Sequence, residues 1–237
     1  MKRLINGLMP VVLASALQAY AAGEGDLSEL TASSSAATTE WSVVKADKRH
    51  NITTYYKRED NKRFRSFKAE AIYEASFEAA ACHQLDVENY PRWYMNIEQS
   101  RILKRVSDTE FYMYLKLKAP LGVPPRDVPL HVVITPYSAK TGALTISYSA
   151  VADYLPVNPG IVRMAVYEVG TRIAPVETGK VREETEGYAE PGGAAPVWLV
   201  NYLQRQMPYA NMLARSRDIP RYENGKMPCL FKYKEKD

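Results

Sequence analysis

Alternation between apolar and polar residues is the clearest pattern in the middle of the chain. Within Glu110–Lys118 every second residue is apolar, from Phe111 to Leu117, and the residues between them are tyrosine or lysine. A period of two residues is typical of a strand that has one face in the core and the other in water. We therefore predict a half-buried strand here, with Met113 and Leu115 on its inner face.

Further runs rich in β-branched and aromatic residues flank this strand and are separated by turn-forming residues. The predicted strands are Trp41–Lys45, Ile52–Arg58, Phe64–Ile72, Ile102–Val106, Glu110–Lys118, Val128–Tyr137, Leu144–Val151, Val162–Ile173 and Lys180–Tyr188. They predict an antiparallel sheet of about nine strands, which must curl at that size.

Two helical segments interrupt and follow the strands. Ser76 is a candidate N-cap for a helix that runs through Leu85, and Pro91 is expected to break it. The stretch Glu190–Asn201 predicts a strand end, a turn in which Gly192 or Gly193 adopts a positive φ, and the start of a last helix at Pro196.

The last helix is broadly apolar as far as Arg215, and Pro208 inside it predicts a kink or a break. Helices on one side of a large sheet define an α+β fold, a curved antiparallel sheet wrapped around a long C-terminal helix. Such a sheet encloses either a packed core or a cavity.

The N-terminus has the composition of a secretory signal peptide. Lys2 and Arg3 precede a short apolar run, Leu8–Leu17, and Ala19-Tyr20-Ala21 is a cleavage motif. The alternative is a buried N-terminal helix. We expect a signal peptide at 1–21, a linker at 22–39, one domain at 40–218 and a tail at 219–237, with export to the periplasm or the medium.

Charge and cysteine content narrow the picture further. The formal charge of the 237-residue chain is +4, of which Lys2 and Arg3 supply two units, and no dense basic face argues for nucleic acid. The two cysteines, Cys82 and Cys229, form either a disulfide, as export would allow, or two separate buried thiols.

Motifs of several enzyme classes are absent from the sequence. There is no G-x-S-x-G, no G-x-x-x-x-G-K-[ST] and no H-E-x-x-H. His50, His83 and His131 lie far apart and, with two lone cysteines, give no metal-ligand spacing. We predict no catalytic residue, no metal and no cofactor.

Several stretches, in this order and spacing, resemble the START (StAR-related lipid transfer) domains of the helix-grip, Bet v 1-like superfamily. They are Phe67–Ala71 followed by Leu85-Asp86 and Tyr90–Trp93, then Ala119–Val128, Gly160–Met164, and Glu190–Gly193 with Trp198, Asn201, Pro208 and Leu213. The resemblance spans Trp41 to Arg217, and with the export signal it indicates a bacterial exported member.

The resemblance implies a non-catalytic carrier that holds one lipid between the inner sheet face and the last helix, with Ala119–Pro125 as a lid loop. Such domains take sterols, phospholipids, ceramides or isoprenoids. Steroid-binding members pair an acid with an arginine in the cavity, and these positions here are Met113 and Val132. The expected cavity lacks that pair. Thr171 replaces a common tryptophan.

We predict a set of ligand-binding residues from strand parity and from this resemblance. They are Met113, Leu115, Arg126, Leu130, Val132, Ile146, Tyr148, Arg163, Leu199, Leu203 and Met207. Plain core packing is the alternative for the apolar ones, because inner strand positions are buried in any sheet protein. For Arg163 the alternative is a structural ion pair with Glu168 or Asp127, and Arg126 can instead fix a strand end.

The predicted function is non-enzymatic lipid binding and transfer by a monomer that touches membranes transiently. Two other classes stay open. One is a helix-grip cyclase or hydrolase acting on a hydrophobic substrate, and the other is a protein-interaction module that uses the cavity mouth.

Overall fold

A single large sheet organises the fold, as the alternation predicts. The computed structural model of the chain describes residues 38–119, 122–225, 227 and 229. Its strands are β1 Thr38–Asp47, β2 Ile52–Arg58, β3 Ser66–Glu74, β4 Ile97–Ser107, β5 Glu110–Leu117, β6 Arg126–Thr135, β7 Leu144–Ala150, β8 Val162–Arg163, β9 Val166–Glu177 and β10 Lys180–Glu190. Their order is β1-β2-β3-β10-β9-β7-β6-β5-β4, and β8 pairs with β6.

The last strand of the sequence lies inside the sheet, next to the third strand. β10 pairs with β3 from Lys180 opposite Glu74 to Gly187 opposite Phe67, and its other edge pairs with β9. β10 therefore joins the first meander, β1 to β3, to all the later strands. The predicted α+β fold with an antiparallel sheet of about nine strands is confirmed.

One predicted strand is divided in the structure. The sequence predicts a single strand over Val162–Ile173, but β8 ends at Arg163 and β9 begins at Val166. β8 runs parallel to the start of β6, with Val162 opposite Arg126, so this one pairing departs from the antiparallel pattern. β8 is held beside β6 by the Arg163 guanidinium, which binds Asp127, and by the Met164 amide, which donates to the Asp127 carbonyl at 2.9 Å.

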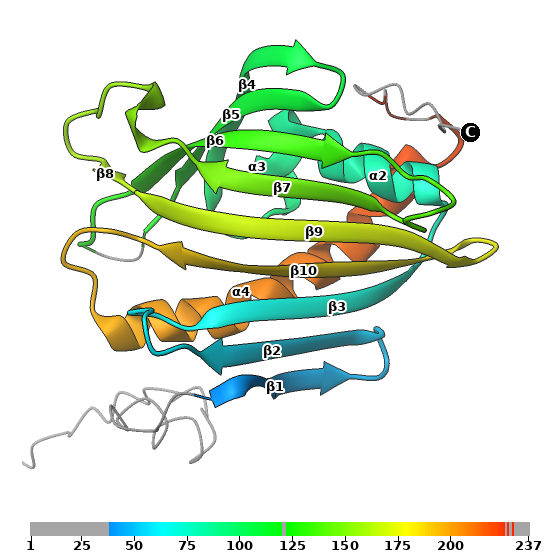
Figure 1. The fold of residues 1–237 in the computed structure, drawn as a ribbon, viewed down its shortest axis with the longest axis horizontal. Coiled ribbons are helices and arrows are strands. Elements are labelled where there is room, and N and C mark those ends of the chain that lie inside the picture. Colours follow the sequence, from blue (N-terminus) through cyan, green and yellow to red (C-terminus); the bar gives the residue numbers. More distant parts are fainter. Residues whose placement is uncertain (1–37, 120–121, 226, 228, 230–237) are drawn as a thin grey trace, which may run out of the picture. The chain divides into compact units, whose positions relative to one another are not determined.

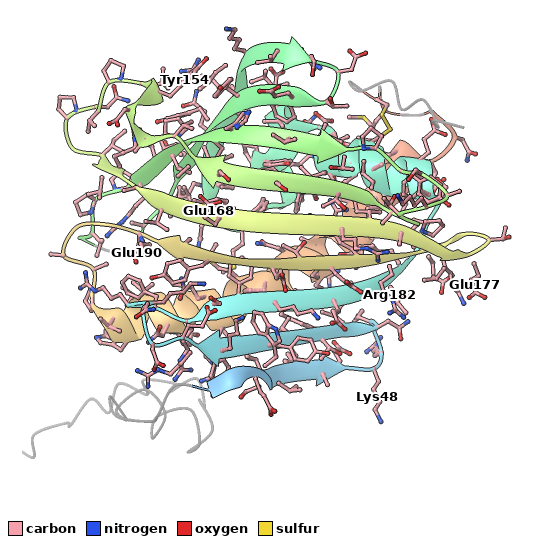
Figure 2. All side chains as sticks on the ribbon, viewed as in Figure 1. Lys48, Tyr154, Glu168, Glu177, Arg182 and Glu190 are labelled. Carbon is pink, nitrogen blue, oxygen red and sulfur yellow. A yellow bond between two sulfur atoms is a disulfide. The ribbon has the colours of Figure 1, made fainter. Side chains whose placement is uncertain are left out.

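The helices are grouped on one face of the sheet, with α4 running along it and α2 and α3 beside it (Figure 1). The bounds are α2 Phe77–Leu85, α3 Tyr90–Trp93 and α4 Val197–Asp218, with 3₁₀ turns η1 Val87–Asn89, η2 Ala152–Tyr154 and η3 Ile219–Gly225. On the opposite face, strand residues such as Glu168 and Arg182 are exposed (Figure 2).

Local sequence signals explain where these helices begin. The Ser76 hydroxyl accepts a hydrogen bond from the Ala79 amide at 3.1 Å, so the predicted N-cap of α2 is confirmed. Pro91 does not break this helix, which already ends at Leu85; it lies in the first turn of α3, where its missing N–H leaves no backbone bond unmade.

The turn before α4 has the predicted backbone geometry. Gly192 and Gly193 both adopt positive φ, at 66° and 61°, which a side chain would disfavour. A Cβ on Gly192 would also lie 3.1 Å from the Arg163 carbonyl oxygen. Pro196 is the N-cap residue of α4, one position before the first helical turn in which it was predicted. A kink or a break was predicted at Pro208, and α4 continues through it without a break.

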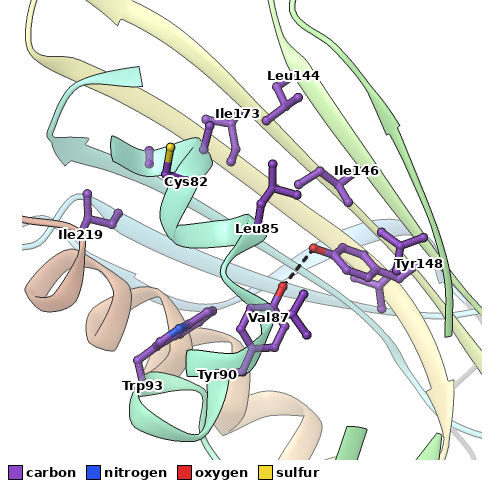
Figure 3. Packing of buried hydrophobic residues seen from close by; sticks show 14 of the residues in the cluster. Cys82, Leu85, Val87, Tyr90, Trp93, Leu144, Ile146, Tyr148, Ile173 and Ile219 are labelled. Carbon is purple, nitrogen blue, oxygen red and sulfur yellow. Dashed lines mark hydrogen bonds between the residues drawn. The ribbon is translucent and has the colours of Figure 1, made fainter. Parts of the chain in front are cut away.

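The core fills the space between the sheet and α2. Leu85 on α2, Ile146 and Leu144 on β7, and Ile173 on β9 belong to one buried cluster, seen in Figure 3. Tyr114 departs from the predicted alternation: it is buried although it lies on the outer face of β5, because its hydroxyl donates to Asp127, which Arg163 also binds.

The described part of the predicted tail packs against the domain. Ile219 and Tyr222 of η3, which open the segment predicted as a tail, are buried. Cys82 on α2 is bonded to Cys229, with the Cα atoms 5.0 Å apart, which ties Cys229 to α2. Of the two possibilities left open for the cysteines, a disulfide or two separate thiols, the structure has the disulfide.

The signal peptide predicted at 1–21 lies outside the described residues, as does most of the linker at 22–39. Within the part of the chain that the structure describes, no helix has the length and apolarity needed to cross a bilayer.

Candidate functional site

A cavity of about 200 Å³ lies between the sheet and α4. Its wall combines strands far apart in sequence with the helices that cover them. The sheet contributes Phe67, Ala69, Ile97, Leu115, Leu117, Arg126, Leu130, Tyr148, Tyr167, Val169, Thr171, Glu183, Thr185 and Ala189, and α2, α3 and the segment after it contribute Gln84, Tyr90, Trp93, Tyr94 and Asn96. Most of these side chains are apolar or aromatic, which is typical of a site for a hydrophobic ligand.

α4 closes the cavity with one stripe of its surface. Its lining residues are Leu199, Val200, Leu203, Gln204, Met207, Pro208, Asn211, Met212 and Arg215. They recur every three or four residues, the spacing that places side chains on one helix face. Outside this stripe, Val197, Trp198 and Tyr202 are 41%, 56% and 45% exposed. The helix is therefore apolar on two faces, only one of which the fold buries.

A buried ion pair stands at the end of the cavity near the C-terminus of α4. Glu183 on β10 and Arg215 on α4 approach to 2.6 Å between Oε2 and Nη2, and each side chain is only 2% exposed. Both line the cavity. Burial raises the pKa of Glu183, and the positive charge of Arg215 opposes that shift. The two opposite charges neutralise each other. A single charge buried at this end of the cavity would be strongly disfavoured.

Neutral polar groups surround this pair. Arg215 donates to the Gln84 side-chain oxygen, and the Gln84 amide donates to the Tyr148 hydroxyl at 2.9 Å. Tyr148 and Tyr90 face each other at 3.4 Å between their oxygens (Figure 3). Burial raises the pKa of Tyr148 to about 12, so it stays neutral. The polar end therefore offers hydrogen bonds without adding net charge.

Threonines extend the polar end along the sheet. The hydroxyls of Thr171 on β9 and Thr185 on β10 lie 2.9 Å apart, and Thr185 donates to Glu183 Oε1 at 3.5 Å. All three residues belong to the cavity wall. The cavity thus has an apolar length under α4 and one end that can hydrogen-bond.

His83 supports Arg215 from behind the cavity wall. Arg215 donates to His83 Nδ1 at 2.9 Å, and the opposite ring nitrogen lies 3.2 Å from Asp218, which also binds Arg92. Burial, together with the positive charges of Arg215 and Arg92, lowers the pKa of His83 to about 2. His83 is therefore a neutral acceptor for Arg215.

Acid should weaken the fold through His83. Its pKa in the folded protein lies far below the ordinary value of 6.5, so below pH 6.5 the unfolded chain binds a proton that the folded chain refuses. The contribution of His83 to the free energy of unfolding is therefore fully present above pH 6.5. Below it, this contribution falls by up to about 1.4 kcal/mol per pH unit. Urea unfolding at several pH values from about 7.5 to about 4.5 measures how the free energy of unfolding changes with pH.

His83→Asn is the matched variant for this slope, because its side-chain oxygen can still accept from Arg215 while the titrating ring is gone. Other groups that titrate on unfolding are present in both proteins, so their slopes cancel in the comparison. We expect a flatter pH dependence for His83→Asn; equal slopes would show that His83 is not the acid-sensitive group.

Seven of the predicted ligand residues lie on the cavity wall. They are Leu115, Arg126, Leu130, Tyr148, Leu199, Leu203 and Met207. Arg126 also fulfils its alternative role, since it donates to the carbonyls of Pro124 and Pro191 and so ties the start of β6 to the turn before α4. Whether these residues bind a ligand remains a prediction.

The other predicted ligand residues lie elsewhere. Met113, Val132 and Ile146 are fully buried in the core, where plain packing was the alternative. Inner strand parity selected them, but they pack in the same buried cluster as Leu85 of α2 and do not line the cavity. Arg163 lies off the cavity wall and forms a two-point ion pair with Asp127, at 2.7 and 3.1 Å. This is the structural role that the sequence left open.

Sequence reasoning missed the Glu183–Arg215 pair. The acid–arginine pair of steroid-binding START domains is absent from its usual positions, which are Met113 and Val132 here. The cavity instead has an acid on β10 and an arginine on α4. A signal was present: Glu183 shares its parity with Val181 and Thr185, whereas the residues between them are charged. Arg215 also continues the three-to-four residue spacing of the cavity stripe.

Among the described residues, no group of three or more histidine, cysteine, aspartate or glutamate side chains could hold a metal ion. The site as built can enclose an apolar molecule and hydrogen-bond one end of it.

A sheet that wraps around a long C-terminal helix, with a mostly apolar cavity between them, defines the helix-grip fold. The START-type fold predicted from the sequence is confirmed by comparison with solved structures. A STAR-related lipid transfer protein fragment from Xanthomonas axonopodis is similar over 76% of this chain and 98% of that one, with 28% identity and a TM-score of 0.69.

A human protein shows the same fold at lower identity. Human StAR-related lipid transfer protein 5 matches over 77% of this chain and 89% of its own, with 18% identity and a TM-score of 0.64. No family model matches the sequence, and no curated protein matches it. START-like structures are thus what this chain is similar to across its described domain.

Proposed function

We propose that the protein is a non-enzymatic carrier that binds one hydrophobic ligand beneath α4 and transfers it between membranes. The observation that carries this proposal is the cavity, whose wall is apolar along α4 and polar at one end. Removing a lipid chain from a membrane exposes apolar surface to water at about 0.8 kcal/mol per CH₂, and an apolar cavity avoids that cost. The similar Xanthomonas axonopodis protein is named as a lipid transfer protein, which supports the proposal.

The test is the ligand itself. Protein purified from its own host without detergent should carry one hydrophobic molecule per chain in native mass spectrometry, and organic extraction should release it unchanged. A folded protein that is empty and takes up no lipid from vesicles would contradict the proposal. A bound molecule that is chemically converted over time would favour the alternative, a cyclase or hydrolase.

The domain boundaries and the location of the protein form part of the proposal. We propose a domain at 40–218 that follows a signal peptide at 1–21 and a linker at 22–39, and a protein that works outside the cytoplasm as a monomer. The disulfide between Cys82 and Cys229 supports this location, since such bonds persist in oxidising compartments. Mass spectrometry of the mature N-terminus would check the cleavage site.

Membrane contact is proposed through the exposed face at the start of α4. Trp198 and Tyr202, four residues apart and 56% and 45% exposed, share the helix with the cavity-lining Leu199 and Leu203. Tryptophan and tyrosine favour the interface between lipid and water, because their rings are amphipathic. A membrane bound there would lie next to the cavity cover.

The double variant Trp198→Ser/Tyr202→Ser should bind phospholipid vesicles about tenfold more weakly, which corresponds to losing about 1.4 kcal/mol of interfacial burial. Vesicle flotation measures the binding. Because both side chains are exposed, unfolding in urea should change by less than about 0.5 kcal/mol per site. Tyr154→Ser, at another exposed tyrosine, is the control and should bind as the parent does. An equal loss in the control would contradict a specific docking face.

A further inference from the structure

The polar end of the cavity contains two buried atoms whose hydrogen-bonding capacity the protein leaves unused. In the described part of the chain, Arg215 Nε and Glu183 Oε2 are buried and have no hydrogen-bond partner. Oε2 lies 2.6 Å from Arg215 Nη2, and its second lone pair accepts no hydrogen bond within the described residues. Each unmet buried polar atom costs about 1–3 kcal/mol, so a ligand group that satisfies both atoms would bind favourably.

Charge balance restricts what that group can be. Glu183 and Arg215 neutralise each other, and the cavity-lining side chains that bond to them, Gln84 and Thr185, are neutral. A phosphate or carboxylate placed here would face the Glu183 carboxylate with no unpaired cation. In a site sheltered from water, an uncompensated charge is strongly disfavoured.

The other cationic residues of the wall, Arg126 and Lys118, lie far from this end, and Lys118 directly follows Leu117, which pairs with Arg126. Arg126 is held by the carbonyls of Pro124 and Pro191, beside the turn that precedes α4. Arg215 lies in the last turn of the same helix. The helix between Leu199 and Arg215 rises about 24 Å, so Arg126 cannot compensate an anion at the Glu183–Arg215 pair.

A hydroxyl group fits the two unused atoms. Its oxygen can accept a hydrogen bond from the Arg215 Nε–H while its hydrogen is donated to Glu183 Oε2. A carbonyl can only accept, and an ammonium can only donate. We propose that the cavity selects a neutral lipid alcohol, whose hydroxyl group bridges Arg215 Nε and Glu183 Oε2 while its apolar part extends beneath α4. This inference rests on the proposed function, because it requires a hydrophobic ligand in the cavity.

The test compares probes that share one apolar chain and differ in the head group. Dodecanol, dodecanoate and dodecyl phosphate are titrated at pH 8 against the delipidated full chain, by displacement of a fluorescent apolar probe and by native mass spectrometry. We expect dodecanol to bind at least about tenfold more tightly than either anion, since one satisfied hydrogen-bonding pair is worth on the order of that factor. Equal binding, or tighter binding of either anion, overturns the inference. Binding of none of the three overturns the carrier function itself.

Variants connect the preference to the pair. Glu183→Gln leaves Arg215 without its counter-charge, so dodecyl phosphate should bind about tenfold or more better than to the parent and the preference for dodecanol should be lost. Because a lone buried arginine can impair folding, Glu183→Leu/Arg215→Met is made in parallel; it should bind dodecanol and dodecane alike.

Glu98→Gln is the control with the same chemical change. Glu98 pairs with Lys116 at the surface and is not part of the cavity wall, so its variant should keep the parent preference. An unchanged preference in both Glu183 variants would overturn the assignment of the hydroxyl site.

Discussion

Replacing Arg215 by methionine should destabilise the protein by about 3–5 kcal/mol at pH 8, the largest effect on stability that we expect from a single substitution. The reason is that the change leaves the Glu183 carboxylate, 2% exposed, without its partner at 2.6 Å. The loss should shrink as pH falls, because Glu183, whose pKa burial already raises, can take up a proton and become neutral. Urea unfolding at several pH values measures both effects.

The double variant Arg215→Met/Glu183→Leu separates the unpaired charge from lost packing. Replacing both members of a buried pair by apolar residues is often nearly neutral, so the second substitution should recover at least about half of the loss. Part will persist, because Arg215 also donates to His83 and to the Ala80 carbonyl. If the double variant is no more stable than Arg215→Met, the pair is not what makes the single substitution costly.

Leu203→Asp should abolish ligand binding, the largest expected effect on function. Leu203 lies on the cavity stripe of α4 and is only partly buried, so the empty protein can hydrate the new carboxylate and stay folded. A bound apolar chain would remove that water, and an unpaired buried charge costs several kcal/mol. Affinity for a fluorescent fatty probe should fall at least about 100-fold, or about 2.7 kcal/mol.

Gln206→Asp is the matched control on the same helix. Gln206 is exposed and does not line the cavity, so the same charge there should leave affinity within about twofold. Both variants should show the helical and near-ultraviolet spectra of the parent. Parent-like binding by a folded Leu203→Asp protein would show that the ligand does not lie under α4.

The fold was largely predictable because its local signals agree with its tertiary arrangement. Alternation identified β5, the Ser76 hydroxyl identified the start of α2, and the glycines at 192 and 193 identified the turn before α4. The division of β8 from β9 was not predictable, because β8 is held beside β6 by the contact of Arg163 with Asp127, a residue 36 positions earlier. Tyr114 was misplaced for the same reason: what covers the outer face of β5 is distant in sequence.

The candidate site was predictable in part. Seven predicted ligand residues lie on the cavity wall, since strand parity and helix periodicity correctly give the inner faces. Parity cannot tell which part of an inner face a helix fills. Ile146 therefore packs in the cluster with Leu85 of α2, while Leu130 on the neighbouring strand borders the cavity.

The sequence by itself determined the class of fold, the last helix and the turn that leads into it. These depend on periodicity, proline and glycine, which act within a few residues. The tertiary structure decided the chemistry inside, because β10 and the last turn of α4 bring Glu183 and Arg215 into contact across the cavity. Burial then makes that contact a charge-balanced pair, a property that neither residue has in its own segment.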